Sequence, residues 1–284
     1  WRAMGDPSAK LLMVVQPNER NVFDQRWIAT MLWELHGVRV VRATLREIHD
    51  GASLGADNVL SYGGDTFSVV YFRAGYAPGD FPTEVEWSAR ELLERSAAVK
   101  SPSVAMQLAG TKKVQQVLAA PGELERFVKS PEDAAEMRKV FAGLYALDGA
   151  GAGDAVAMGL ADPDGYVLKP QREGGGNNLY GDELVAALQT FDPGASPGAP
   201  GDLSAYILMG RIRPPPNRSL CLRAGVLTEM DTLSELGVYG GYLRVRDEVV
   251  LNVQGGHLLR TKAAESDEGG VAAGYAVLDS PYLY

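Results

Sequence analysis

The hydrophobic positions in roughly the first hundred residues alternate between runs typical of strands and spacings typical of helices. An apolar run at 11–15 is followed by apolar residues at helical spacing over 23–35, and Gly37 ends that pattern. Further strands are expected at 38–43 and 69–72, and a helix is expected around 89–93. This order predicts an α/β layer with a partly parallel sheet.

From about residue 101 the pattern changes to helices and then to a glycine-rich β section. Ser130-Pro131-Glu132 supplies an N-cap, a first-turn proline and an acid for a helix that we expect to carry the apolar positions 137–144. The Pro/Gly/Ala/Ser-rich stretch 192–203 is expected to be a connection. Strands are expected at 166–168, 206–209, 242–245 and 249–253. The fold class is therefore α/β together with α+β.

The composition narrows the possible functions. The 284 residues are 46% hydrophobic and 22% charged, which is enough material for one large core or two smaller ones. The net charge of -9 opposes general electrostatic binding to nucleic acid or anionic membranes, so any phosphate site needs a local concentration of Lys and Arg. The single cysteine, Cys221, cannot form an intrachain disulfide, and no apolar run approaches the roughly 20 residues that span a bilayer. A reducing, cytoplasmic location fits best.

The strongest motif is Lys-Pro-Gln-Arg-Glu-Gly-Gly-Gly-Asn-Asn at 169–178, which lies between an expected strand and an expected helix. Its three glycines leave backbone amides able to approach phosphate oxygens, and Lys169 adds positive charge. Glu173 or Asn178 could hold a metal ion. The block is neither a Walker A loop nor a dinucleotide fingerprint. A phosphate clamp and a flexible hairpin loop both remain compatible with it.

A second basic cluster occupies 257–262 and precedes a loop of small residues at 269–274. Arg260 and Lys262 are two residues apart on an expected strand, so both can face one anionic ligand. The loop of small residues permits close approach of the backbone. A solvated basic edge is the alternative interpretation of this cluster.

A third group of polar residues follows the first and third expected strands. The segment 19–25 offers a carboxylate, a guanidinium and two amides, which suit a zwitterionic peptide, although a surface N-cap is the alternative. Arg73, beside Gly75 and Tyr76, ends an apolar strand and could bind an anion. Because open α/β sheets bind ligands beyond the carboxyl ends of their strands, we expect Gln16 to Asn21, and Arg73 with Tyr76, on one rim.

These motifs, in this order, resemble eukaryotic-type glutathione synthase along essentially the whole chain. The resemblance is carried by Gln-x-x-Glu-Arg-Asn-x-Phe-Asp-Gln at 16–25, by 107–116, by 169–180 and by 269–274. It implies an ATP-grasp ligase, a homodimer, that uses ATP and Mg²⁺ to join γ-glutamylcysteine to glycine through an acyl phosphate. It also implies a substrate-binding domain at 1–100 and an incomplete ATP-grasp domain at 101–284.

The resemblance further implies roles for individual residues. Those that would contact ATP are Lys112, Lys169, Gln171, Arg172, Glu173, Gly174, Gly175, Gly176, Asn177, Asn178, Tyr180, Met209, Gly210, Arg211, Ile212, Glu235, Lys262 and Glu268. Glu173 would be the magnesium ligand. Those that would contact substrate are Glu19, Arg20, Asn21, Gln25, Arg73, Ala74, Gly75, Tyr76, Arg260, Val271 and Ala272. Arg260 and Lys169 are the catalytic candidates.

Some features depart from the family pattern. Ala74 replaces an acid, Gly210 and Arg211 replace a Glu-Lys pair, and Glu268 stands for an aspartate. The family's N-terminal portion, with an arginine for substrate and a Glu-x-Asn group for metal and nucleotide, is not in this chain, so we expect an incomplete metal site. Two alternatives stay open: a β-alanine acceptor, as in homoglutathione synthases, or a fragment that binds nucleotide or peptide without turnover.

Overall fold

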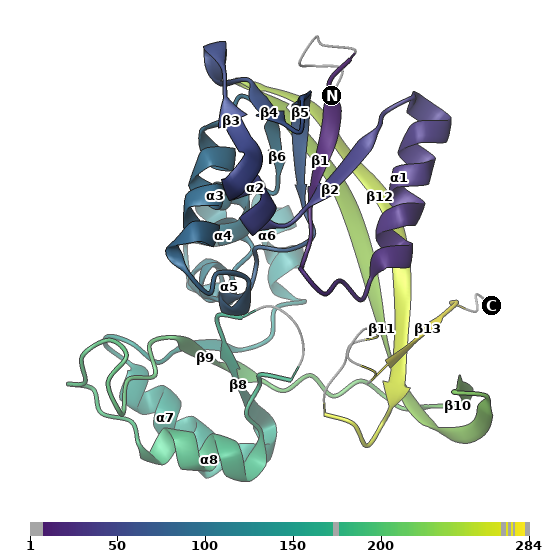
Figure 1. The fold of residues 1–284 in the computed structure, drawn as a ribbon. Coiled ribbons are helices and arrows are strands. Elements are labelled where there is room, and N and C mark those ends of the chain that lie inside the picture. Colours follow the sequence, from purple (N-terminus) through teal and green to yellow (C-terminus); the bar gives the residue numbers. More distant parts are fainter. Residues whose placement is uncertain (1–7, 173–175, 268–270, 272–273, 275, 282–284) are drawn as a thin grey trace. The chain divides into compact units, whose positions relative to one another are not determined.

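The computed structural model describes residues 8–172, 176–267, 271, 274 and 276–281. The chain divides into two compact units, Trp1–Thr111 and Lys112–Tyr284, and each is described by itself (Figure 1).

Unit 1 is built on a six-stranded mixed sheet with the order β2-β1-β5-β4-β3, in which β6 also pairs with β5. Strand β1 runs parallel to both β2 and β5, and β5 runs parallel to β6, whereas β3, β4 and β5 are joined as antiparallel neighbours. This arrangement confirms the predicted partly parallel sheet. The strands are β1 (Lys10–Val14), β2 (Val40–Ala43), β3 (Ala52–Leu54), β4 (Leu60–Tyr62), β5 (Asp65–Phe72) and β6 (Val99–Ser101).

The helices of unit 1 cover both faces of this sheet (Figure 1). Alternate residues of β1 point to opposite faces, so Met13 packs in the cluster that includes Ile28 of α1, while Leu12 packs with Ile48 of α2 and Leu93 of α3. The helices are α1 (Val22–His36), α2 (Leu45–Gly51), α3 (Glu84–Arg95) and α4 (Val104–Ala109), with short 3₁₀ turns at Ala56–Asn58 and Pro78–Asp80.

Local capping explains where these helices begin and end. Thr44 and Thr83 form capping boxes with Glu47 and Glu86, which satisfy backbone amides at the starts of α2 and α3. Gly37 ends α1 in the left-handed conformation, at φ +67°, as the sequence predicted.

Unit 2 contains a three-stranded antiparallel sheet in the order β7-β9-β8. Helices α7 and α8 contribute to its core, in which Leu168, Leu184, Leu188 and Leu208 are buried. The strands are β7 (Leu144–Ala146), β8 (Tyr166–Pro170) and β9 (Tyr206–Gly210), and the helices are α5 (Lys112–Ala119), α6 (Pro131–Arg138), α7 (Ala152–Ala161) and α8 (Gly181–Gln189), with 3₁₀ turns at Leu124–Arg126 and Pro163–Gly165.

A second, antiparallel sheet of unit 2 has the order β10-β11-β12-β13 and is dominated by one long hairpin (Figure 1). Its strands are β10 (Asn217–Arg223), β11 (Val226–Val245), β12 (Glu248–Ala263) and β13 (Ala276–Asp279). The predicted strands at 242–245 and 249–253 are confirmed as the tip of this hairpin, and both belong to much longer strands.

Two expectations for unit 2 are wrong. The helix expected to run to residue 144 ends at Arg138, because Leu144 begins β7 and pairs with Met209. The glycine-rich section expected to follow that helix as β structure contains helix α7 before β8, and the sequence pattern did not indicate this helix because its glycines weaken the helical signal. Gly159 suits this helix because a Cβ there would lie 2.5 Å from Leu188 Cδ1, so only glycine fits the packing without a shift.

Candidate functional site

The carboxyl ends of β1 and β5 meet at one rim of the unit 1 sheet, since Val14 and Phe72 are register partners. A cavity of about 320 Å³ opens there. Its walls are Gln16, Glu19, Asn21 and Gln25 from the β1–α1 segment, and Tyr71, Phe72, Arg73 and Tyr76 from β5 and the loop after it. The prediction that these two groups share a rim is confirmed.

Glu19 and Gln25 form the polar wall on the β1 side. Gln25 is 1% exposed, and its Nε2 donates to Glu19 Oε2 at 2.5 Å. The backbone amide of Asn21 donates to Glu19 Oε1 at 2.8 Å. Partial burial acts to raise the pKa of Glu19, but these donors and the nearby Arg73 outweigh it and hold that pKa below its usual value. Glu19 is therefore an anion at neutral pH.

Arg73 supplies the opposite charge from the β5 side. Its guanidinium forms an ion pair with Asp24 of α1 and donates to the hydroxyl of Tyr71 at 3.3 Å. Burial, with Asp80 and Glu19 nearby, raises the pKa of Tyr76, so its phenol stays protonated at neutral pH. The cavity thus presents one carboxylate, one guanidinium and neutral hydrogen-bonding groups, which is an arrangement suited to a small zwitterion.

Asp80 organises the loop that carries these residues, although the sequence reasoning missed it. Its Oδ2 accepts hydrogen bonds from the backbone amides of Gly75, Tyr76 and Ala77 at 3.0, 3.2 and 3.2 Å. Its Oδ1 accepts from Gln16 Nε2 at 3.2 Å, so one carboxylate joins the segments that follow β1 and β5. The Pro-Gly-Asp turn just after Arg73–Tyr76 is the only local signal that could have indicated it.

Arg20 and Ala74, which the resemblance implies as substrate contacts, do not line the cavity. Arg20 is exposed and does not line the cavity. Ala74 is 2% exposed and packs in the core with Val14 and Phe72, so its side chain does not face the cavity. Any contact between Ala74 and a ligand there would have to come from its backbone.

In unit 2, the motif after β8 is closed at its base and held by the start of α5. Leu168 and Leu179 exchange backbone hydrogen bonds of 3.1 and 3.0 Å. Lys112 Nζ donates to the carbonyl of Arg172 at 2.6 Å, and the Lys113 amide donates to Gln171 Oε1 at 3.1 Å. Lys112 therefore reaches the predicted phosphate-binding loop. Glu173, Gly174 and Gly175 lie outside the described residues, as do Glu268 and Ala272.

Asp267 is a second residue that the sequence reasoning missed, and three predicted nucleotide contacts meet at it. Lys262 Nζ donates to the Asp267 carbonyl at 2.9 Å, and the Tyr180 hydroxyl donates to the same oxygen at 3.4 Å. Arg211 forms an ion pair with the Asp267 carboxylate and lies over the Tyr180 ring, 5.5 Å from its centroid. Asn178 joins the group through a 3.3 Å hydrogen bond to Tyr180. The only signal for this role in the sequence was the presence of an acidic residue five positions after Lys262.

The other unit 2 residues that were predicted to contact ATP or substrate lie either in strands or in turns. Glu235 and Arg260 are direct cross-strand partners and form an ion pair, although the resemblance assigns them to different ligands. Lys169 lies in β8, and its register partner Ile207 lies in β9, the strand that also contains Met209. After β9, the amides of Gly210 and Arg211 donate to the carbonyls of Gly143 and Gly165, and Ile212 is 68% exposed. In the loop after β8, Gly176 has φ +85° and Asn177 precedes Asn178. The carbonyl of Val271 accepts a hydrogen bond from the Gly274 amide.

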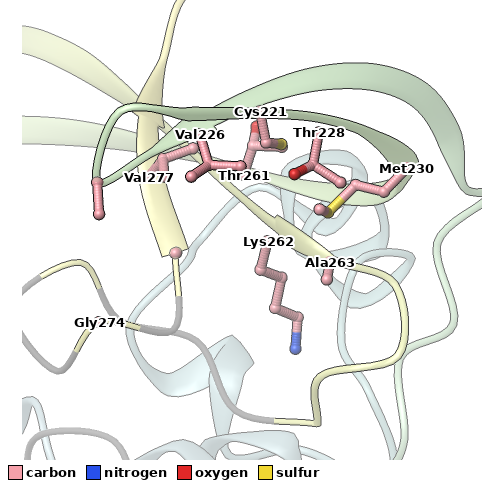
Figure 2. Close-up of a pocket in the computed structure, with 11 residues that line it drawn as sticks. Cys221, Val226, Thr228, Met230, Thr261, Lys262, Ala263, Gly274 and Val277 are labelled. Carbon is pink, nitrogen blue, oxygen red and sulfur yellow. The ribbon is translucent and has the colours of Figure 1, made fainter.

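A second cavity, of about 360 Å³, lies on the β10–β13 sheet (Figure 2). Cys221, Thr228, Met230, Thr261 and Lys262 are among the residues that line it, and the Lys262 side chain points away from the other four (Figure 2). Arg260 and Lys262 are two residues apart in a regularly paired part of β12, so their side chains point to the same face of the sheet. The expectation that these two cations share a face is confirmed.

The described part of the chain gives no geometry for a magnesium ion. Among its residues no group of three or more His, Cys, Asp or Glu side chains could hold a metal ion, and the predicted ligand Glu173 is not described. Nor does any helix within the described ranges have the length and apolar character needed to cross a membrane.

The sequence as a whole is similar to one family of known proteins. A family model described as "Eukaryotic glutathione synthase, ATP binding domain" matches residues 10–283. Chloroplastic glutathione synthetases of Solanum lycopersicum and Arabidopsis thaliana are 50% and 49% identical over 283 residues, which is 100% of this chain but only 50% and 51% of theirs. Glutathione synthetase of Homo sapiens is 48% identical over 285 residues, covering 99% of this chain and 58% of its own. The chain thus spans about half the length of these relatives.

A solved structure supports the fold alone. A glutathione synthetase-like effector from Globodera pallida, in its apo form, superposes with a TM-score of 0.73 at 23% identity, covering 100% of this chain and 59% of that one.

Proposed function

The chain belongs to the eukaryotic glutathione synthase family, and from that premise we propose that it forms the substrate-binding and nucleotide-binding part of a ligase. That ligase would join γ-glutamylcysteine to glycine at the expense of ATP. The observation that carries the proposal is the rim cavity of unit 1, where the anionic Glu19 and the cationic Arg73 lie in one small polar site. Unit 1 would be the substrate-binding domain, and unit 2 would be part of the ATP-grasp domain.

The γ-glutamyl end of the substrate carries an ammonium and a carboxylate on one carbon. Glu19 would bind the ammonium and Arg73 would bind the carboxylate, both through charge-assisted hydrogen bonds. This pairing leaves the cysteinyl carboxylate at the far end of the dipeptide free to react. A ligand without the ammonium would form no charge-assisted hydrogen bond with Glu19, which disfavours such ligands.

The proposed reaction needs no enzymic nucleophile. The cysteinyl carboxylate oxygen attacks the γ-phosphorus of ATP, ADP leaves, and the glycine amine then displaces phosphate from the acyl carbon and loses a proton. Within this chain, Lys169 near the end of β8 and Lys112, which reaches the loop after β8 from α5, would neutralise the charge that develops on the phosphates. Arg260 on β12 would bind substrate. Mg²⁺, when bound, would neutralise further phosphate charge, and Glu173 is its candidate ligand.

Membership of the family does not specify the acceptor amine, the oligomeric state or the location of this protein. The choice between glycine and β-alanine rests on the Val271-Ala272 loop and stays open, as does a role in binding alone. A homodimer is a prediction from the family. The predicted cytoplasmic location is also untested, and two plant relatives are named as chloroplastic.

The test uses ADP release by this chain and by a polypeptide of the full length of its relatives. Each is supplied with γ-glutamylcysteine, magnesium ATP, and either glycine or β-alanine. We expect glycine-dependent turnover in the full-length form, and Glu19→Gln should raise its KM for γ-glutamylcysteine, whereas Glu34→Gln on the exposed surface of α1 should not. No substrate-dependent turnover in the full-length form would rule out the ligase and favour the binding-only alternative.

A further inference from the structure

Arg42 lies behind the rim cavity rather than in its wall. It is in β2, where it pairs in register with Met13 of β1, and it does not line the cavity. Its Nε and one terminal nitrogen donate to Gln25 Oε1 at 3.1 and 2.8 Å. Arg42 therefore acts on the cavity only through Gln25, which is buried between Arg42 and Glu19.

The contact with Arg42 determines which way the Gln25 amide points. A guanidinium only donates hydrogen bonds, so it must face the carbonyl oxygen of the amide. The amide nitrogen is then left on the other side, where it donates to the Glu19 carboxylate. Turning the amide by 180° would set its NH₂ against the guanidinium and its oxygen against the carboxylate. Because Gln25 is 1% exposed, water cannot relieve either mismatch.

We propose that Arg42 is a positioning residue for the cation subsite of the cavity, because it fixes the orientation of Gln25 and, through it, the direction of the Glu19 carboxylate. This inference rests on the proposed function and deepens it. Arg42 touches no part of the γ-glutamyl substrate. It makes Gln25 an obligatory donor to Glu19, and the fixed carboxylate then discriminates in favour of a ligand that carries an ammonium group.

The removal of Arg42 should affect one substrate only. Without the guanidinium, the Gln25 amide is free to rotate, and Glu19 loses a fixed donor that keeps its carboxylate aligned. The KM for γ-glutamylcysteine should rise, while the KM for ATP should not, since no nucleotide contact of the proposed site lies in unit 1. A merely structural role for Arg42 would instead lower stability and change all kinetic constants together.

The experiment measures initial rates of the full-length enzyme carrying Arg42→Met, Arg42→Lys or the matched control Arg39→Met. Arg39 is close by on the same segment, is exposed, stacks on Trp33, and does not line the cavity. We expect Arg42→Met to raise the KM for γ-glutamylcysteine at least about tenfold, and Arg42→Lys, which keeps a donor-only cation, to recover part of the loss. Arg39→Met should match wild type.

A second readout is the pH profile of kcat/KM for γ-glutamylcysteine. In Arg42→Met its acid limb should move to higher pH, because Glu19 loses the fixed Gln25 donor that favours its charged form. If the methionine variant does not fold, Arg42→Lys should show a smaller shift of the acid limb in the same direction, because lysine replaces the two guanidinium donors by a single ammonium. Equal KM values and pH profiles in the Arg42 and Arg39 variants would overturn the inference alone. A wild-type enzyme without turnover of γ-glutamylcysteine would overturn the proposed function and this inference with it.

Discussion

Replacing Gly159 by alanine should destabilise unit 2, although glycine to alanine in a helix usually stabilises. Gly159 lies inside α7 at its contact with α8 and β9. An added Cβ would lie 2.5 Å from Leu188 Cδ1 and 3.3 Å from Leu208 Cδ1. These leucines are 1% and 0% exposed, so neither side chain can move aside into solvent.

The size of the effect follows from two opposing terms. Alanine gains up to about 1 kcal/mol of helix propensity over glycine. Forcing a methyl group into a packed core costs about 1–3 kcal/mol. Gly153 provides a control in the same helix, because a Cβ there would meet nothing within 4 Å. The propensity gain is common to both variants, so Gly159→Ala should be less stable than Gly153→Ala by the overpacking term, about 1–3 kcal/mol.

The assay is urea unfolding of wild type and both variants, followed by circular dichroism, with the change read from the midpoints at a common slope. Gly153→Ala should unfold at or above the wild-type midpoint, and Gly159→Ala should unfold below the Gly153→Ala midpoint. Equal midpoints for the two variants would refute the close packing of α7 against Leu188 and Leu208.

Three further predictions concern the polar contacts. Asp80→Ala should raise the KM for γ-glutamylcysteine several-fold, because three loop amides lose their acceptor, and Asp80→Asn should raise it less. Initial-rate measurements that show an unchanged KM for Asp80→Ala would contradict this role. A hydrogen bond from Arg138 lowers the pKa of Glu125 to about 2, from 4.5, so the stabilisation from this pair is complete above pH 4.5 and is lost as the pH falls towards 2. Arg138→Gln should therefore weaken the acid dependence of the unfolding midpoint, and an unaltered dependence would exclude the pair as its source. Lys112→Met should raise the KM for ATP, whereas Lys113→Met, whose lysine pairs with Asp148, should change it less; ATP titrations that give equal shifts would count against Lys112.

The candidate site was predictable where its residues follow strand ends. Glu19 and Arg73 could be placed on one rim because parallel neighbouring strands bring their carboxyl ends together, whatever loops come after them. Asp80 and Arg42 could not be placed there. Asp80 accepts hydrogen bonds from backbone amides of its own loop, and Arg42 acts through Gln25, whose side chain comes from α1.

The sequence by itself determined the positions of β1, α1, β2, β5 and α3 in unit 1, the end of α1 at Gly37, and the motif at 169–178. Each depends on spacing, capping or composition over a few residues, and such signals are local. Only the tertiary structure decided that Leu144 begins a strand, that the glycine-containing α7 is a helix, and that Lys262, Tyr180 and Arg211 meet at Asp267. In these cases contacts between residues distant in sequence outweigh the local preference, because strand pairing, close packing and ion pairs depend on which segments the fold brings together.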